Sequence, residues 1–322
     1  GVGDLCGIKS RLSYLKLLGI DVIWLSPVYQ SPNDDNGYDI SDYRKIYAGF
    51  GSNEDMDELI KKAHEHGIKI VLDLVVNHTS DEHAWFVESR KSKDNKYSDY
   101  YIWKDPKADG SEPNNWGSSF CGSAWEYDEE RGQYYLHFYS RKQPDLNWEC
   151  EEMRQELYDM MNWWLDKGVS GFRMDAITFI KKDLSFPPMP SDGEDGRCDV
   201  GKCCLNRPGI DEFLHELKLN TYGRGDFVTV AETPGGPNED LDRYIGRDGH
   251  FSMIFDFSYT DIDINPGDLW LHQRDWTIEE FKDKLFTNQR LVKKIGWAAN
   301  YLENHDQPRS IGKYFPAGDI PE

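Results

Sequence analysis

The sequence predicts an α/β fold with parallel strands, because short apolar runs alternate with amphipathic segments along the chain. Residues 20–25 and 68–76 are two such runs, and each is typical of a strand that is covered on both faces. The length of 322 residues fits one large α/β barrel or about two ordinary domains. We therefore expect a parallel sheet whose strands are joined by helices.

The amphipathic segments predict helices, since their apolar residues recur at helical spacing. The first segment ends at Gly19, the second begins at Ser52 and ends at Gly67, and the third is closed by Gly168. Ser52 with Asp55 resembles a capping box. The apolar positions of the three helices are Ile8, Leu12, Leu15 and Leu18, then Met56, Leu59, Ile60 and Ala63, then Met153, Leu157, Met160 and Trp164.

Further strands are expected at residues 171–174, 227–231, 251–257 and 297–302. Two stretches depart from the alternation. Residues 79–147 are polar, aromatic and rich in turns, which predicts a small subdomain inserted after the strand that ends at Val76. Residues 181–207 are expected to form a long loop. The predicted organisation is thus a first barrel part at 1–78, the inserted subdomain at 79–147, and a second barrel part at 148–322.

The charge balance excludes several classes of partner. There are 37 Lys and Arg against 58 Asp and Glu, a net charge of −21. Nucleic acid and anionic membranes would repel such a surface, so we expect neither as a partner. No apolar run is long enough to span a bilayer. The 11 Trp, 18 Tyr and 15 Phe residues favour either stacking platforms for sugar rings or a large aromatic core.

The six cysteines show no CxxC pair and are too sparse for a disulfide scaffold. We expect free thiols and a cytoplasmic location. A soft-metal site is the alternative interpretation for the three that cluster in the polar loop. The cysteines are Cys6, Cys121, Cys150, Cys198, Cys203 and Cys204.

Reactive side chains gather where the predicted strands end. The carboxyl ends of the strands of a parallel barrel open on one face, where active sites are built. Four strand ends are therefore expected to contribute acids, histidines and an arginine to a single site. The residues are Asp73 and His78, then Arg173 and Asp175, then Glu232, and finally His305 and Asp306.

These segments carry a family resemblance. Residues 73–78 (Asp-Leu-Val-Val-Asn-His), 171–175 (Gly-Phe-Arg-Met-Asp), 231–232 (Ala-Glu) and 304–306 (Asn-His-Asp) resemble the four signature regions of the α-amylase family of glycoside hydrolases. Residues 143–148 (Gln-Pro-Asp-Leu-Asn-Trp) resemble the extra signature of its oligo-1,6-glucosidase and α-glucosidase subgroup.

The resemblance implies a (β/α)8 TIM barrel with a subdomain inserted after the third strand. Only about strands two to seven of such a barrel can be assigned to the chain. We therefore expect a fragment that lacks the first strand, the eighth barrel unit and the C-terminal β domain of the family.

The resemblance also implies roles for the acids. Asp175 would be the nucleophile, Glu232 the general acid/base, and Asp306 the third acid, which holds the distorted sugar ring. Arg173 could keep Asp175 ionised by its opposite charge, and Asp73 would orient Arg173. Retaining hydrolysis needs two carboxyl groups about 5–5.5 Å apart.

The same resemblance places other residues around the terminal sugar. Tyr38 would stack on the ring and Asp35 would grip its far hydroxyl, although Asn-Gly in this segment also signals a plain surface turn. His78 and His305 would donate to hydroxyls, or either could be a core histidine. Phe120 would add an aromatic wall from the inserted subdomain.

Ala176, the residue after the nucleophile, bears on linkage specificity. In the resembled subgroup valine here goes with α-1,6-glucosidases, whereas alanine or threonine goes with α-1,4-preferring enzymes. Alanine leaves room that a β-branched residue would fill, so we expect an α-1,4 preference. The alternative is that Ala176 only packs against the next strand.

No cofactor is expected to be required. The first five residues resemble the tail of an acidic metal-binding loop of the family. The carbonyl of Val2 and the side chain of Asp4 could therefore line a structural site for Ca²⁺ or Mg²⁺, which prefer oxygen ligands.

The expected function is a retaining α-glucosidase that hydrolyses terminal α-glucosidic bonds of short malto-oligosaccharides through a covalent glycosyl-enzyme. An oligo-1,6-glucosidase, a sucrose isomerase or a transglycosylase would use the same acids. A different class is the non-catalytic amylase-like accessory protein, which typically loses catalytic carboxylates. The expected partner is a small oligosaccharide or disaccharide, bound by a monomer.

Overall fold

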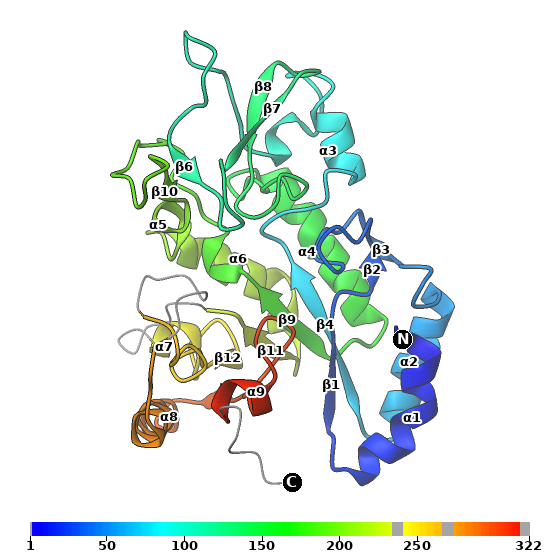
Figure 1. Ribbon diagram of the computed structural model, residues 1–322. Coiled ribbons are helices and arrows are strands. Elements are labelled where there is room, and N and C mark those ends of the chain that lie inside the picture. Colours follow the sequence, from blue (N-terminus) through cyan, green and yellow to red (C-terminus); the bar gives the residue numbers. More distant parts are fainter. Residues whose placement is uncertain (1, 234–240, 266–273, 316–322) are drawn as a thin grey trace. The chain divides into compact units, whose positions relative to one another are not determined.

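The structure is a computed structural model, and it describes residues 2–233, 241–265 and 274–315. The chain divides into two compact units, Gly1–Val228 (unit 1) and Thr229–Glu322 (unit 2). Both contain parallel strands with helices (Figure 1).

The sheet of unit 1 has parallel strands in the order β1-β4-β9, which confirms three predicted strands. Asp73 of β4 pairs in register with Arg173 of β9, and Val75 pairs with Asp175. Residues two apart on a strand share a face, so this register places three reactive side chains together. The strands are β1 (Val22–Leu25), β4 (Lys69–Val75) and β9 (Gly171–Asp175).

Helices cover this sheet, and α1 and α2 lie side by side (Figure 1). The predicted capping box at Ser52 and Asp55 is confirmed, with the side chain of each accepting from the backbone N–H of the other. The apolar faces predicted for the second and third helices are buried. The helices are α1 (Leu5–Leu17), α2 (Asn53–Glu65), α4 (Glu151–Asp166) and α6 (Ile210–Asn220), followed by the short η3 (Tyr222–Arg224).

Two details of the first predicted elements are wrong. Leu18 is 62% exposed, because α1 ends one residue earlier and Leu18 serves as its C-cap. Val22 is 40% exposed, so β1 is not covered on both faces. Among the described residues β1 pairs only with β4, which makes it an edge strand.

Gly171 begins β9 at a point of very close backbone approach. Its φ is +147°, and a Cβ added there would lie 1.7 Å from the carbonyl oxygen of Val228. The backbone N–H of Val228 donates to the carbonyl of Ser170 at 2.9 Å. Only a residue without a side chain allows this approach.

The inserted segment at 79–147 forms an antiparallel sheet in the order β5-β8-β7 beside a separate short strand, β6. Its core includes Trp116, Trp125 and Leu136. The exact limits of this subdomain stay a prediction. The elements are α3 (Ala84–Ser89), η1 (Ser98–Tyr100), β5 (Trp103–Lys104), β6 (Trp116–Gly117), β7 (Trp125–Asp128) and β8 (Gln133–Leu136), and the hairpin β2 (Tyr29–Gln30) with β3 (Asp42–Ile46) precedes them.

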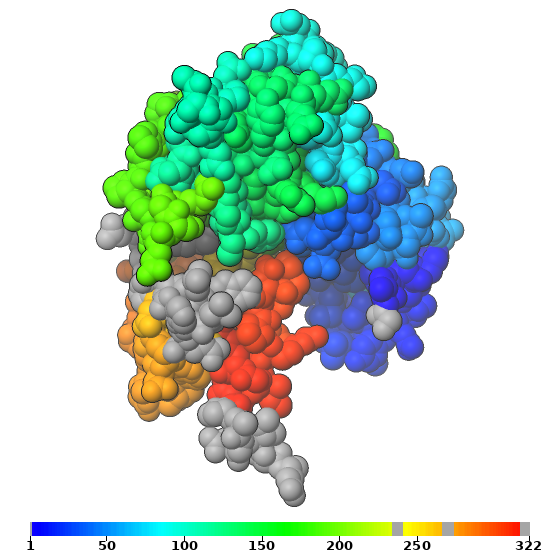
Figure 2. Space-filling model, turned by 45° about the horizontal axis from the view of Figure 1, so that its top comes forward, coloured from blue at the N-terminus to red at the C-terminus, as the bar shows by residue number. Residues whose placement is uncertain are grey.

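The predicted long loop at 181–207 is partly regular, so that prediction is wrong for its last third. β10 (Cys198–Asp199) pairs with β6, and α5 (Gly201–Cys204) follows it. Cys203 and Cys204 belong to the core cluster of the inserted segment, and their burial explains why the chain is ordered there. Figure 2 shows the two segments as one continuous surface.

Unit 2 has three parallel strands in the order β11-β12-β13, and the three strands predicted there are confirmed with shorter limits. Ala231 pairs with Ile254, and Ile254 pairs with Ala298. Across the described residues of the whole chain, no helix is long and apolar enough to cross a membrane. The elements are β11 (Val228–Ala231), α7 (Leu241–Tyr244), β12 (Met253–Phe255), α8 (Ile278–Val292), β13 (Trp297–Ala299) and α9 (Ser310–Tyr314).

Candidate active site

Arg173 joins two carboxylates at the carboxyl ends of β4 and β9. Its Nη1 lies 3.0 Å from Oδ1 of Asp73 and 2.5 Å from Oδ1 of Asp175. All three side chains are buried. Buried charges are tolerated where they are paired and hydrogen-bonded, and the strand register provides that pairing. The structure thus brings together three predicted site residues of unit 1.

Asp73 receives two further hydrogen bonds, both on Oδ2. The hydroxyl of Tyr38 donates to it at 3.0 Å, and Nε1 of Trp24 donates at 3.2 Å. The Arg173 guanidinium lies over both rings, at 5.7 Å and 5.3 Å from their centroids. Burial raises the pKa of Asp73, and the Arg173 charge opposes that rise. Asp73 is therefore a rigidly held anchor for Arg173.

A second cluster joins Asp35 and His78 through Gln143. Nε2 of Gln143 donates to Oδ2 of Asp35 at 2.8 Å and lies 3.2 Å from Nε2 of His78. Burial lowers the pKa of His78 to about 4, which leaves the ring neutral at pH 7. Sequence reasoning quoted Gln143 only as the first residue of a signature, and that signature was the signal that could have found it.

A buried ion pair lies next to this cluster. Nζ of Lys182 is 3.0 Å from Oδ2 of Asp145, and both side chains are at most 1% exposed. Lys182 also donates to Oδ1 of Asn77. Sequence reasoning missed Lys182. The preceding residue, Lys181, is also a lysine, and it forms an ion pair with Glu149. Nothing in the local sequence separates the two lysines.

Ala176 has an unusual backbone for a residue with a side chain. Its φ is +44° in the left-handed region, and it is buried in the apolar cluster that contains Phe138 and Phe179. Such strained positions concentrate at functional sites. The role of Ala176 in linkage specificity stays a prediction.

Phe120 lies on the inserted segment and is 54% exposed. Its ring is 5.3 Å from that of Tyr139, which in turn lies 5.3 Å from the ring of His78. An aromatic path therefore connects the predicted wall to the cluster around Gln143. The role of Phe120 as a wall for sugar stays a prediction.

In unit 2, Glu232 follows β11 and is half-buried. Burial raises the pKa of Tyr301, and the negative charge of Glu232 adds to that rise. His305 and Asp306 follow β13, with Nε2 to Oδ2 at 3.1 Å and side-chain exposures of 32% and 59%. The structure brings these two together on a partly open loop. Asp175 lies in unit 1 and Glu232 lies in unit 2. The distance between their carboxyl groups stays a prediction.

The side chain of Glu303 joins the two ends of the loop that carries His305 and Asp306. Its carboxylate accepts from the backbone N–H of Ser310 at 2.5 Å, from the Ser310 hydroxyl at 2.7 Å and from Nη1 of Arg309 at 2.9 Å. These donors lower the pKa of Glu303 to about 2. Sequence reasoning did not single out Glu303, although it precedes the third signature acid by only three residues.

The predicted cation site has few donors among the described residues. Oδ1 of Asp4 accepts from the backbone N–H of Gly7 at 2.5 Å and so caps α1. Val2 is exposed. The Val2 carbonyl oxygen and the two carboxylate oxygens of Asp4, one of which already accepts from Gly7, fall short of the about six to eight ligands that Ca²⁺ takes. These residues alone do not fit the ion, and the site stays a prediction.

The clustered cysteines are free thiols in the structure, and all three are buried. Burial raises the pKa of Cys198 to about 11 and that of Cys204 further. Over residues 2–233, 241–265 and 274–315, no group of three His, Cys, Asp or Glu side chains could hold a metal ion. The soft-metal alternative therefore gains no support.

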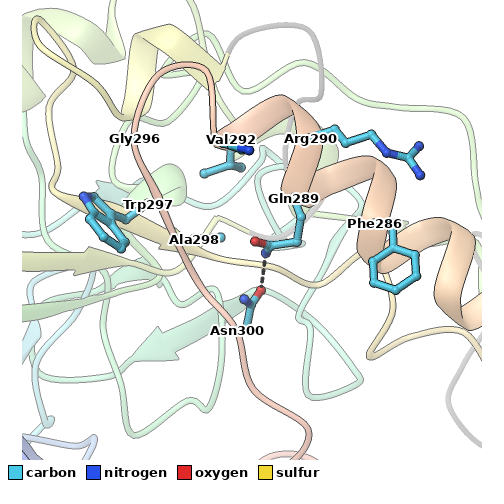
Figure 3. Close-up of a pocket in the computed structure, with 9 residues that line it drawn as sticks. Phe286, Gln289, Arg290, Val292, Gly296, Trp297, Ala298 and Asn300 are labelled. Carbon is cyan, nitrogen blue, oxygen red and sulfur yellow. Dashed lines mark hydrogen bonds between the residues drawn. The ribbon is translucent and has the colours of Figure 1, made fainter.

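A pocket of 730 Å³ in unit 2 lies between α8 and β13 (Figure 3). Gln289 of α8 donates to Oδ1 of Asn300 across it, at 2.8 Å. The layer between a strand and its covering helix is ordinarily a packing layer, and none of the residues lining this pocket is a predicted site residue. It is therefore not part of the candidate active site.

The comparison with family models defines the class of protein. Residues 1–316 match the α-amylase family, described as alpha amylase, catalytic domain. The chain belongs to the α-amylase family. The catalytic domain of that family is a (β/α)8 TIM barrel, so the predicted fold class and family are confirmed.

The chain is similar to named enzymes within this family. The chain is 55% identical to an oligo-1,6-glucosidase of Heyndrickxia coagulans, over 98% of this chain and 57% of the relative. It is 51% identical to the oligo-1,6-glucosidase of Bacillus cereus, over 98% of this chain and 56% of the relative. The chain thus spans a little over half the length of these relatives.

Among solved structures, a trehalose-6-phosphate hydrolase of Bacillus licheniformis matches with a TM-score of 0.91 and 44% identity, over 99% of this chain and 56% of that chain. An isomaltulose synthase mutant of Erwinia rhapontici, solved with its substrate sucrose, matches with a TM-score of 0.90 and 41% identity, over 97% and 55%. The similar proteins therefore act on different glucosides with a shared fold.

Proposed function

We propose that the protein is a retaining α-glucosidase that hydrolyses terminal α-glucosidic bonds of short oligosaccharides. The observation that carries the proposal is the buried Asp73–Arg173–Asp175 cluster at the carboxyl ends of β4 and β9. The relatives named above support the same class. The signature acids Asp175, Glu232 and Asp306 are all present, which argues against a non-catalytic accessory protein.

In the proposed mechanism, Asp175 attacks the anomeric carbon and Glu232 protonates the leaving oxygen. Water, deprotonated by Glu232, then hydrolyses the glycosyl-enzyme ester and releases the sugar with its configuration retained. Arg173 stabilises the ionised form of Asp175 by opposite charge, since its Nη1 lies 2.5 Å from that carboxylate. Asp306 and His305 hold hydroxyls of the distorted ring.

The terminal sugar would occupy a pocket formed by Asp35, Tyr38, His78 and Phe120. Tyr38 supplies an aromatic face whose hydroxyl is already fixed on Asp73. Oδ2 of Asp35 accepts from Gln143. In this proposal Oδ1 of Asp35 accepts from a sugar hydroxyl.

For linkage, we propose a preference for α-1,4 bonds on the basis of Ala176. The names of the similar curated relatives favour α-1,6 bonds as a second candidate. Sucrose isomerisation is a third, since the sucrose-bound isomaltulose synthase shares the fold.

Product analysis of the full-length protein on maltose, isomaltose, sucrose and trehalose tests these candidates. Release of α-glucose with a higher kcat/KM on maltose than on isomaltose supports the proposal. A preference for isomaltose supports oligo-1,6-glucosidase instead. Isomaltulose or trehalulose formed from sucrose would identify an isomerase, and no turnover of any substrate would overturn the proposal.

Three further expectations remain proposals. The free thiols support a cytoplasmic location, and the protein is proposed to act as a monomer without a required cofactor. A structural Ca²⁺ or Mg²⁺ would need ligands beyond Val2 and Asp4. A metal-dependent shift in the melting temperature of the full-length protein would support such an ion.

A further inference from the structure

Gln143 is placed to control two residues of the proposed sugar pocket at once. Its side chain is 1% exposed and lies between Asp35 and His78, from two segments far apart in the sequence. We propose that Gln143 is a positioning residue, whose amide fixes Asp35 and His78 relative to each other for the terminal sugar. This inference rests on the proposed function.

The amide of Gln143 uses both of its donor hydrogens and one lone pair of its oxygen. Its Oε1 accepts from the backbone N–H of Ser140 at 3.1 Å, and the two hydrogens of Nε2 face Asp35 and His78. A side-chain amide offers two donor hydrogens on its nitrogen and an oxygen acceptor with two lone pairs, both on the same carbon. A hydrocarbon of the same size would leave a carboxylate and a ring nitrogen without this shared donor, and unsatisfied buried groups are costly.

The backbone beneath Gln143 is held firmly. The Leu146 N–H donates to the carbonyl of Asn77 at 2.9 Å, and the Thr79 N–H donates to the carbonyl of Pro144 at 3.2 Å. The Asp145 side chain accepts from the backbone N–H of Phe138 at 2.9 Å and is paired with Lys182. The side chain of Gln143 therefore projects from a rigid support, which a positioning role requires.

The adjacent residue provides a matched control. Lys142 pairs with Asp34 at 3.1 Å, one position along on both sides of the Gln143–Asp35 contact. Both side chains of that pair are well exposed, and an exposed pair of this kind contributes little. Replacing Lys142 removes a side chain from the same stretch of chain but changes no residue of the proposed pocket.

The first test compares Gln143→Leu with Lys142→Leu in the full-length protein, with folding checked by circular dichroism and melting temperature. We expect Gln143→Leu to lower kcat/KM by roughly 10- to 100-fold, the size of a lost hydrogen bond to a charged group. The loss should be equal on maltose, isomaltose and an aryl α-glucoside, because all three share the terminal glucose. Lys142→Leu should stay within about twofold of wild type.

The second test is a pH profile of Gln143→Glu, which keeps the shape and changes the donor. Asp35 and His78 face the new carboxyl directly, and the charges of Asp145 and Lys182 act on the pKa of His78 in opposite directions. At neutral pH two carboxylates repel each other, whereas a proton shared between them restores the bridge to Asp35. The ratio of kcat/KM to wild type should rise at least about fivefold as the pH falls from about 7.5 to 5.5.

The outcomes separate the two proposals. Gln143→Leu within about twofold of wild type, or a Gln143→Glu ratio that does not change with pH, would overturn the positioning role while leaving the α-glucosidase proposal intact. If Gln143→Leu does not fold, the pH profile of Gln143→Glu decides alone. A wild-type protein that turns over none of the three glucosides overturns the proposed function and this inference with it.

Discussion

In unit 1 the charged side chains near the carboxyl ends of β4 and β9 are buried and bonded to one another, whereas in unit 2 the loop after β13 leaves Asp306 and His305 partly open to solvent. Buried charges must be neutralised by partners, and Arg173 does this for Asp73 and Asp175. Exposed charges are stabilised by water instead. Unit 1 therefore carries its part of the proposed site in a fixed geometry, and unit 2 carries its acids on a loop.

The largest effect is expected at Asp175. Asp175→Asn should lower turnover by roughly a thousandfold or more, because an amide cannot form the glycosyl ester. Steady-state kinetics with circular dichroism as a folding control measure this. We also expect Asp306→Asn to change the melting temperature less than Asp175→Asn does, since Asp306 of unit 2 is exposed and Asp175 of unit 1 is buried. Retained activity above a thousandth of wild type in a folded protein would remove Asp175 from the role of nucleophile.

Glu232→Gln should give the next largest effect, and one that depends on the leaving group. We expect a loss of roughly 100- to 10,000-fold on disaccharides and a much smaller one on activated aryl glucosides, which need little protonation. Kinetics on both substrate types measure the difference. Equal losses would instead assign Glu232 a structural role in unit 2.

Ala176→Val should shift the ratio of kcat/KM toward isomaltose by roughly 10- to 200-fold, the range expected for one or two methyl groups in a pocket. It should also lower stability, because a β-branched residue is strained at the left-handed φ of +44°. Ala176→Gly is the control, since glycine accepts that backbone. A wild type that already prefers isomaltose, or a ratio that does not move, would contradict the linkage prediction.

The smallest effect concerns a buried histidine of unit 1. Burial lowers the pKa of His83 to about 3, from about 6.5 when unfolded. The unfolded chain therefore binds the proton more tightly, and stability is lost as the pH falls below about 6.5. His83→Phe should reduce the slope of unfolding free energy against pH by up to about 1.4 kcal/mol per pH unit. Urea unfolding at pH values from about 6.5 to 5 measures it, and an unchanged slope would show that His83 is already charged in the folded protein.

Much of the framework could be predicted because its signals are local. Apolar runs marked the strands, and Ser52 with Asp55 marked the start of α2. Signature segments at strand ends then located Asp175 and its neighbours. The parallel register explains why Asp73 and Arg173, a hundred residues apart, could be assigned to one cluster.

The parts that could not be predicted depend on contacts between distant segments. Lys181 and Lys182 are identical in sequence, and only tertiary packing decides which is buried against Asp145. The bridge from Gln143 to Asp35 spans 108 residues. Likewise, β10 forms because it pairs with β6 and because the chain directly after it packs into an apolar cluster of the inserted segment. The sequence of residues 181–207 alone contains no signal for either contact.

The close approach at Gly171 has a consequence for the evolution of β9. Even Gly171→Ala would force the backbone away from Val228, so selection for folding would remove substitutions at the first residue of this five-residue strand. Under the proposed function, substitutions at Asp175, its last residue, would instead be removed by selection for turnover. In a mutant library, cellular abundance would therefore report on one end of β9 and catalytic output on the other.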